Sequence, residues 1–373
     1  MKKKTLVFIV GLLVIAGLVL VSCAQPEPQT VEVIKTVIVT EIVEGEVQEV
    51  VKEVVVVETV EVEVEVPAEV EEMEKPVTLN WNLGTEPPTA DPSLTTDTTS
   101  VFVTGNIFVA LTRIEPVKND VVPYLATEWE VGEDADGNQT WTFNLRDDIP
   151  WVNYDPLTGE TTQEVDDEGN PRFVNANDVV YGVKRTLDPA TGSTYAYVLY
   201  IIKNAAAVNG GEEGVTLDDV GIVALDDWTV QFTLENAAGY FPSIASMWVA
   251  YPMPQWLIDS DLGDKWTEAS IIVTNGPYVM ESWIHGGEMV LVKNPLWVDA
   301  DNVQIERVEM PMIVEASTAF AMYENNELDT TGVPLPEMDR VKADPVLSAE
   351  FYNAPNACTY YYGFTNNKAP FDD

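Results

Sequence analysis

Short stretches of the chain alternate apolar and polar residues, which is the pattern of strands that bury one face. The clearest are residues 77–83, 140–145, 229–234 and 289–293. A run rich in Asp and Gly at residues 134–138 precedes the second stretch and is typical of a turn. We therefore expect these stretches to be strands connected by loops and turns.

Two other segments, residues 176–187 and 315–324, carry apolar residues at helical spacing. Asn177 is placed to cap the first helix, and three valines then fall on one of its faces. Strands and helices intermix without a strict βαβ rhythm, which predicts a mixed α/β or α+β fold. About 300 residues of globular sequence exceed one compact core, so two packed subregions are expected.

The N-terminus has the pattern of an export signal. Three lysines precede an apolar run at residues 6–21, which is shorter than the roughly 20 residues that cross a bilayer as a helix. Residues 20–23 resemble the lipobox of bacterial lipoproteins, in which the peptidase cuts before a cysteine that carries the lipid. The resemblance implies that residues 1–22 are removed and that Cys23 is lipidated. The alternative is an ordinary transmembrane anchor with an incidental cysteine.

Residues 23–76 follow as the anchor cysteine and a low-complexity stalk of Val, Glu, Thr and Pro. The stalk lacks aromatic residues and cannot supply a diverse core, and its acidic residues repel one another. The valines between 47 and 55 fit one face of a helix, whereas residues 60–66 alternate as in a strand. We interpret the stalk as an extended spacer, with a short self-associating coil as the alternative.

Charge narrows the choice of partners. The chain has 62 acidic and 19 basic residues and a net charge of -43, which disfavours nucleic acid and anionic membrane surfaces. Its hydrophobic content of 46% and its ten tryptophans are nevertheless those of a packed protein. We therefore place the acidic residues on a solvated surface and in the stalk, in preference to a cation-binding function.

Catalytic and metal-binding patterns are weak. The single histidine, His285, lies next to two glycines in an expected hairpin turn, so a catalytic triad would have to be built on a turn residue. Residues 134–138 and 166–170 faintly resemble calcium loops but lack the downstream Glu, and we interpret both as turns. No phosphate loop, dinucleotide fingerprint or zinc spacing occurs. We expect no enzyme activity, no cofactor and no metal.

The most specific motif lies at residues 274–297. A Gly-Pro-Tyr hairpin beginning at Gly276 leads to Trp283, a second strand, and an Asn-Pro-x-Trp turn that ends at Trp297. Gly-Pro forces a turn, Trp283 supplies packing area, and Asn-Pro stops the second strand. This arrangement resembles the signature of solute-binding family 5, the extracytoplasmic binding components of ABC importers.

Further matches support the resemblance and occur in the expected order at residues 123–129, 141–146, 175–181, 227–232 and 325–329. One departure is a long acidic insertion at residues 156–170. Within the family, residues 188–195 and 358–373 are most similar to the oligopeptide-binding proteins.

The resemblance implies a periplasmic-binding-protein-like fold of type II over residues 77–373. It divides this region into a lobe-one core (residues 77–109 and 255–357), an accessory subdomain (110–254) and the start of a second lobe (358–373). Chains of the relatives continue well past this point. We therefore expect the sequence to hold nearly all of lobe one and to lack most of the second lobe.

The resemblance also implies which residues face the ligand, namely Thr96, Asp97, Thr98, Tyr195, Gly332, Val333 and Tyr361. An ordinary Asx or Ser/Thr turn is the alternative for the threonine-rich loop, and core packing or a rim position is the alternative for each tyrosine. Gly332 stands where the peptide binders commonly have an aromatic residue. Cys358 resembles a cysteine that pairs with one in the second lobe of such relatives; a buried free thiol is the alternative.

The function implied is capture of short peptides by a lipid-anchored protein outside the cytoplasmic membrane. The partners implied are an ABC permease with its ATPase, the membrane through the lipid anchor, and no nucleic acid. One alternative is the same fold binding an oligosaccharide or a nickel complex. Another is a tethered sensor or adhesive lipoprotein that keeps the fold for partner binding.

Overall fold

The computed structural model describes residues 33–43, 46–56, 76–353 and 362–372. The chain forms two compact units, residues 1–74 and residues 75–373. Within the described residues, every helix is too short or too polar to traverse a lipid bilayer.

The first unit contains an antiparallel hairpin of β1 (Val33–Val43) and β2 (Glu46–Val56), in which Val33 lies opposite Val56. The helical face expected between residues 47 and 55 is therefore wrong, because this stretch forms β2. Runs of valine favour extended backbone, and here that preference outweighs the helical spacing. Cys23 and residues 60–66 lie outside the described residues.

The second unit is a mixed α/β structure. Its described strands are β3 (Thr78–Asn80), β4 (Thr112–Ile114), β5 (Val121–Pro123), β6 (Ala126–Glu133), β7 (Gln139–Leu145), β8 (Val152–Asp155), β9 (Glu160–Gln163), β10 (Ile222–Asp226), β11 (Thr229–Thr233), β12 (Val273–Thr274), β13 (Tyr278–Ile284), β14 (Glu288–Lys293) and β15 (Arg307–Pro311). Its described α-helices are α1 (Thr98–Ile107), α2 (Ala176–Leu187), α3 (Ala205–Asn209), α4 (Phe241–Ile244), α5 (Gln255–Ile258), α6 (Ala316–Glu324), α7 (Met338–Ala343) and α8 (Leu347–Glu350).

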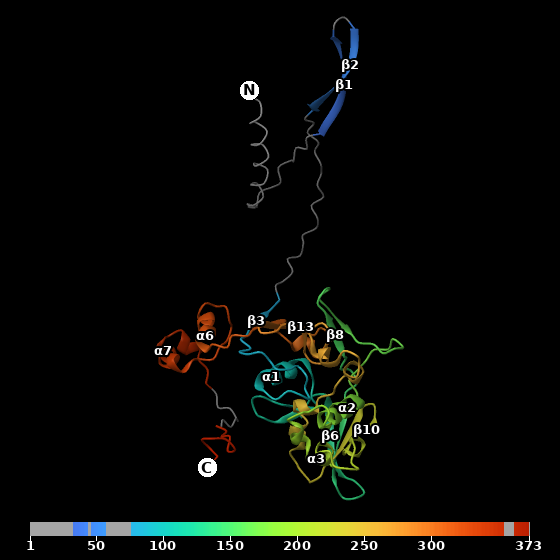
Figure 1. The fold of residues 1–373 in the computed structure, drawn as a ribbon, viewed down its shortest axis with the longest axis vertical. Coiled ribbons are helices and arrows are strands. Elements are labelled where there is room, and N and C mark those ends of the chain that lie inside the picture. Colours follow the sequence, from blue (N-terminus) through green and yellow to red (C-terminus); the bar gives the residue numbers. More distant parts are fainter. Residues whose placement is uncertain (1–32, 44–45, 57–75, 354–361, 373) are drawn as a thin grey trace. The chain divides into compact units, whose positions relative to one another are not determined.

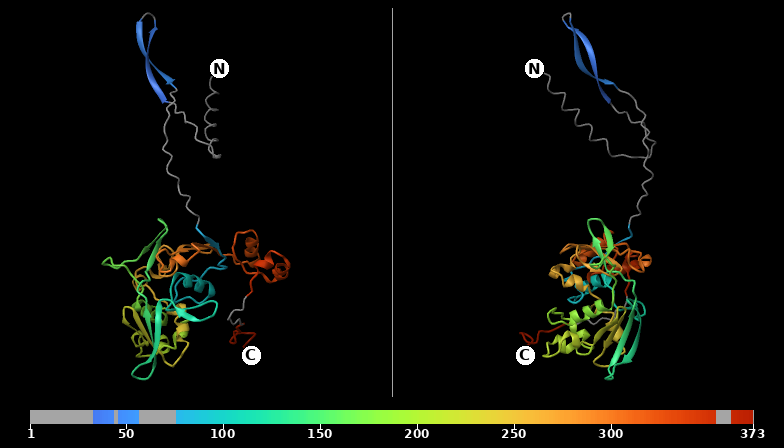
Figure 2. Two further views of the ribbon diagram at one scale, coloured as in Figure 1. Left: turned by 180° about the vertical axis from the view of Figure 1, so that it is seen from behind. Right: turned by 90° about the vertical axis from the view of Figure 1, so that its right-hand side faces the viewer.

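These strands form sheets in the orders β10-β11-β7-β6, β12-β8-β9, β13-β14-β15-β3 and β4-β5. Helix α1 lies between the sheet that holds β3 and β13 and the body made by β6, β10, α2 and α3, while α6 and α7 lie to one side of that sheet (Figure 1). The view from behind in Figure 2 shows the same arrangement. The insertion at residues 156–170 forms β9 and a following turn, so it extends the sheet through β8.

Most of the predicted elements are confirmed. The stretches at 140–145, 229–234 and 289–293 are β7, β11 and β14, whereas the stretch at 77–83 yields only the three residues of β3. Helix α2 has the predicted bounds, and α6 begins one residue later than predicted, at Ala316.

The cap of α2 is Asn175, so the prediction of Asn177 is wrong. Asn175 Oδ1 accepts the backbone N–H of Asn177 at 2.8 Å, and Asp178 Oδ2 accepts the N–H of Asn175 at 3.0 Å, which completes a capping box. The same oxygen of Asp178 accepts Trp151 Nε1–H at 3.0 Å. Burial raises the pKa of Asp178 to about 6, against the opposing effect of these hydrogen bonds. Val179 in α2 is fully buried, and the helix packs against β10 and β11.

The family-like motif joins α1 to the sheet of β13 and β14. The backbone N–H groups of Asn275 and Gly276 both donate to the carbonyl of Ile107, at 3.1 and 2.9 Å. Asn275 Oδ1 accepts the N–H of Val109 at 2.9 Å, and Asn294 Nδ2 donates to the carbonyl of Gly276 at 2.9 Å. A Cβ on Gly276 would lie 2.5 Å from the carbonyl carbon of Ile107, so this approach requires glycine.

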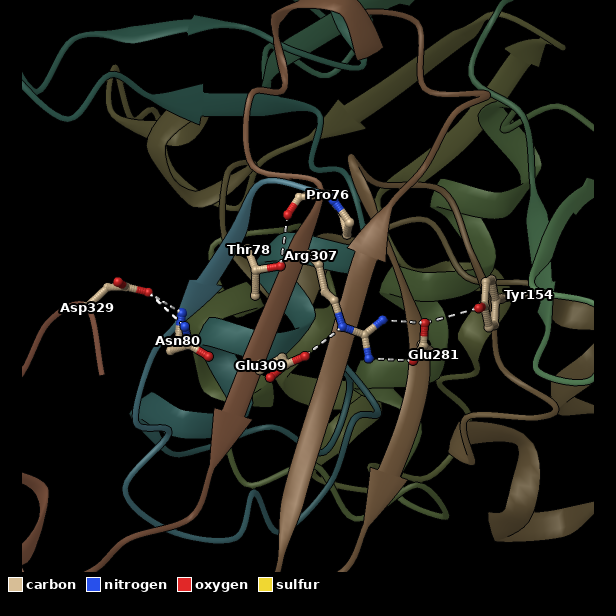
Figure 3. Close-up of polar contacts among 8 residues, drawn as sticks. All are labelled: Pro76, Thr78, Asn80, Tyr154, Glu281, Arg307, Glu309 and Asp329. Atoms are coloured by element: carbon tan, nitrogen blue, oxygen red, sulfur yellow. Dashed lines mark hydrogen bonds and ion pairs between the residues drawn. The ribbon is translucent and has the colours of Figure 1, made fainter. Parts of the chain in front are cut away.

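A polar network connects β15 to β13 across this sheet. Arg307 on β15 donates to both oxygens of Glu281 at 2.8 and 2.7 Å and to Glu309 at 2.8 Å (Figure 3). Glu281 sits where the pairing of β13 with β14 shifts register, and such a bulge redirects a side chain. It also accepts the hydroxyl of Tyr154 from β8 at 3.1 Å. Hydrogen bonds from Arg307 lower the pKa of Glu281, so the pair stays charged at neutral pH.

Candidate functional site

The loop before α1 holds three of the predicted ligand-facing residues. Asp97 is the N-cap of α1, and its Oδ1 accepts the N–H groups of Thr99 and Ser100 at 3.0 and 2.9 Å. Thr96 and Thr98 on either side of it are exposed. The Asx turn that we considered as an alternative is therefore present at Asp97. It leaves the two threonine side chains facing solvent.

One tryptophan, Trp248, contacts both this loop and Tyr195. Trp248 Nε1 donates to the carbonyl of Thr95 at 2.8 Å, and the centroid of its ring is 5.6 Å from that of half-buried Tyr195. The ring of Tyr197, a residue that is 57% exposed, lies 5.5 Å from the ring of Tyr195. The structure therefore brings Thr96, Thr98 and Tyr195 onto one surface. Sequence reasoning missed Trp248, which belongs to no motif.

A buried ion pair fixes the start of the same loop. Arg185 on α2 donates to both carboxylate oxygens of Asp91 at 2.8 and 2.7 Å, and the side chains are only 15% and 4% exposed. Next to it, Thr186 Oγ1 donates to Ser93 Oγ at 3.1 Å. The bidentate geometry holds the loop against the last turn of α2.

Gly332 and Val333 lie beyond β3, on a separate part of the surface. Asp329 Oδ2 accepts the backbone N–H of Asn80 at 2.7 Å, which Figure 3 shows at the edge of the sheet. Thr330 then forms a parallel bridge with Trp81. Gly332 and Val333 line a cavity of about 500 Å³ together with residues of α6, α7 and α8. A Cβ added to Gly332 would meet no atom within 4 Å, so the space in front of it is open.

An aromatic pair lies between these two regions. The rings of Trp81 and Phe102 are 4.1 Å apart, and both side chains are half-buried. Phe102 belongs to α1, whose first residue is Thr98, and Trp81 is bridged to Thr330. The predicted ligand-facing residues that the structure describes therefore form two patches, connected by α1 and this aromatic pair.

Three predicted site residues cannot be placed. Cys23, Cys358 and Tyr361 lie outside the described residues, so the lipid anchor, the disulfide and the contact of Tyr361 stay predictions.

The two calcium-like runs are turns, as expected. Asp134 Oδ1 accepts two backbone N–H groups, and its Oδ2 accepts Asn138 Nδ2 at 2.8 Å. Asp166 makes the same three contacts in its own turn, with Asn170 Nδ2 at 3.0 Å. These hydrogen bonds engage both oxygens of each aspartate. Among the described residues, no group of three or more His, Cys, Asp or Glu side chains is arranged to hold a metal ion.

Sequence and structure comparisons identify the family. Residues 120–373 match the sequence model of the bacterial extracellular solute-binding proteins, family 5. The chain therefore belongs to this family of solute-binding proteins, as the hairpin motif indicated.

Individual relatives agree with this assignment. The chain is 32% identical over 301 residues to the oligopeptide-binding protein OppA of Bacillus subtilis, which covers 79% of this chain and 50% of the relative. It is 29% identical to the probable deoxycholate-binding periplasmic protein YgiS of Escherichia coli, over 83% of this chain and 53% of the relative. The chain thus spans about half the length of these relatives.

A solved structure confirms the fold. Haemophilus influenzae OppA in complex with the peptide RPPGFSPFR matches with a TM-score of 0.68 and 28% identity, over 80% of this chain and 54% of that chain. This likeness confirms the predicted mixed α/β fold of the periplasmic-binding-protein type.

The Arg185–Asp91 pair yields a stability prediction. Arg185→Met should lower the free energy of unfolding by about 3 kcal/mol, because it leaves the Asp91 carboxylate buried without its partner. The matched control is Lys184→Met on the same helix, which breaks a pair with Asp218, whose side chain is 96% exposed, and should cost under about 1 kcal/mol. Urea unfolding followed by far-ultraviolet circular dichroism measures both. Equal losses in the two variants would contradict the role assigned to Arg185.

Proposed function

We propose that this chain is a lipid-anchored solute-binding protein, located outside the cytoplasmic membrane, that captures short peptides and delivers them to an ABC permease and its ATPase. Under this proposal the chain binds its solute without chemical change and is not an enzyme. Membership of the solute-binding family supports the general class. The names of the relatives, OppA among them, support peptides as the solute.

The observation that carries the proposal is the backbone of residues 331–333. Among the described residues, the N–H and C=O groups of this segment have no hydrogen-bond partner, and Gly332 is exposed. The segment continues from the bridge between Trp81 and Thr330, so it extends the edge of the sheet that ends with β3. A peptide can add to such an edge as a further strand, with its backbone held by hydrogen bonds.

The neighbouring cavity suits the side chains of such a peptide. It holds about 500 Å³ beside residues 331–333 and is lined by Phe320, Met338 and Val341, among others. Backbone pairing is indifferent to the sequence of the peptide, and the cavity, which Lys342 and Glu350 also line, can accept both apolar and polar side chains of moderate size. This combination supports broad selection of short peptides.

Peptide binding can be measured on the 373-residue chain. Two- to five-residue peptides should shift the amide NMR signals of residues 96–98, 195 and 331–333 saturably, with dissociation constants of about 0.1–1 mM. Binding should be weak, because both described patches are open to solvent and enclose only part of the ligand. Peptides with the same side chains but N-methylated backbone amides are the matched control. They should bind roughly fivefold more weakly for each lost hydrogen bond of about 1 kcal/mol.

Other solutes are tested in the same experiment. One relative carries the name of a probable deoxycholate-binding protein, so deoxycholate is included with oligosaccharides and a nickel complex. Saturable shifts from one of these, with none from any peptide, would overturn the peptide proposal while keeping the solute-binding class.

The lipid anchor is tested separately. The basic and apolar N-terminus followed by Cys23 supports lipidation. Cells that produce the Cys23→Ser variant should therefore lose metabolic fatty-acid labelling of the protein and accumulate uncleaved or soluble protein. Labelling that persists in this variant would contradict the assignment of Cys23.

A further inference from the structure

His285 lies between two carboxylates that come from distant parts of the chain. It follows β13 in the turn to β14, where its Nδ1 is 2.7 Å from Glu86 Oε1 and its Nε2 is 3.3 Å from Glu268 Oε2. Ionised carboxylates only accept hydrogen bonds. The imidazole can therefore satisfy both contacts only when both of its nitrogens carry a proton, that is, as the charged imidazolium.

Glu86 is held by further donors from the same hairpin. Trp283 Nε1 donates to its Oε1 at 3.0 Å, and the backbone N–H of Gly286 donates to its Oε2 at 2.6 Å. The Trp283 ring also lies against the imidazole, with centroids 4.4 Å apart, where an aromatic face favours a cation. One carboxylate thus fastens the loop that follows β3 to the β13–β14 turn.

The cluster connects three separate segments of the chain. Glu86 belongs to the loop between β3 and α1, His285 to the hairpin, and Glu268 to the residues after the short helix Gly263–Thr267. Among the described residues, these two glutamates are the charged groups that contact the imidazole. The sequence contains no other histidine, so no second imidazole titrates beside it.

We propose that Glu86, His285 and Glu268 form a protonation-dependent clamp, which fastens the loop of Glu86 and the segment of Glu268 to the hairpin while His285 is charged and weakens this attachment when it becomes neutral. A neutral imidazole has one N–H and one acceptor nitrogen, so one of the two carboxylates then faces a lone pair. The proposal does not depend on which solute the protein binds.

The pH range of the clamp follows from the shifted pKa values of His285 and Glu86. The hydrogen bond with Glu86, followed by that with Glu268, raises the pKa of His285 above its usual 6.5. The contribution of His285 is therefore complete below pH 6.5 and is lost as the pH rises through the raised value. For Glu86, burial acts to raise the pKa, but the bonds from Gly286 and His285 outweigh it and hold the pKa below 4.5. Its contribution is therefore lost only in more acidic solution, as the pH falls through that lowered value.

The exposure of the cluster limits the effect to its surroundings. The side chains of His285, Glu86 and Glu268 are 55%, 34% and 42% exposed, so solvent screens their attraction. Release should loosen the attached loop without unfolding the domain. Protons reach the imidazole freely, which allows it to follow the pH outside the cell membrane.

Because the chain has one histidine, NMR can follow this group directly. The imidazole signals of the wild type should titrate with a pKa above 6.5, and in Glu86→Gln and Glu268→Gln the pKa should fall toward or below 6.5. Glu288→Gln is the matched control, since Glu288 is exposed on the same hairpin and has no contact with the imidazole among the described residues. It should leave the titration nearly unchanged.

Hydrogen exchange tests the release itself. After correction for the intrinsic pH dependence, the amides of Gly286, Gly84 and Asp91, which are hydrogen-bonded, should lose protection between pH 5.5 and pH 8.5. In His285→Gln this loss should be absent. A pKa at or below 6.5 in the wild type, an unchanged pKa in Glu86→Gln, or equal protection at both pH values would each overturn the proposal.

Discussion

The second unit depends on the contact between the end of α1 and the turn that begins β13. Two backbone N–H groups of the turn converge on one carbonyl, that of Ile107, and glycine at position 276 is what permits the approach. Asn275 and Asn294 are fully buried, so their hydrogen bonds have no competition from solvent. Because α1 begins at the loop of Asp97, the motif positions the candidate binding surface from the far end of the helix. The residues that identify the family are thus scaffold residues, and their effect on binding is indirect.

The excess of acidic over basic residues explains which partners the described charged side chains have. With 62 acidic and 19 basic residues, most carboxylates cannot have a basic partner. Several are satisfied by backbone N–H groups instead, as at the caps made by Asp97 and Asp178. Some of the few arginines form an ion pair that connects separate segments, as Arg185 does with Asp91 and Arg307 with Glu281. These ion pairs are few, but each one holds together two segments that are distant in the sequence.

The spacing of apolar and polar residues predicted the helices and strands well, but it did not predict the contacts between them. The bounds of α2 and the positions of β7, β11 and β14 follow from periodicity, because a buried face imposes its spacing on the sequence. The cap was misplaced by two residues, since Asn175 and Asn177 are both suitable residues and only the backbone geometry distinguishes them. In the valine-rich region, helical spacing was misleading because valine prefers extended backbone.

The site was predictable only in part. Thr96, Asp97, Thr98 and Tyr195 were predicted to face the ligand through the family resemblance. The structure places them near one another, and their contact with a ligand stays a prediction. Trp248, which joins them, is 153 residues away from Thr95, and Glu86 is 199 residues away from His285. Contacts of this kind leave no periodic signal, because they depend on how the completed elements pack.

Photo-crosslinking tests the central claim, that a peptide binds along the backbone of residues 331–333 and against the patch of Thr96 and Tyr195. A short peptide that carries a diazirine group would be irradiated with the 373-residue chain, and the labelled residues identified by mass spectrometry. Our account predicts labels at residues 96–98, Tyr195, Trp248 and 331–333, which unlabelled peptide should suppress. Labels confined to another cavity, such as that lined by Arg172, Trp228 and Trp256, would contradict it.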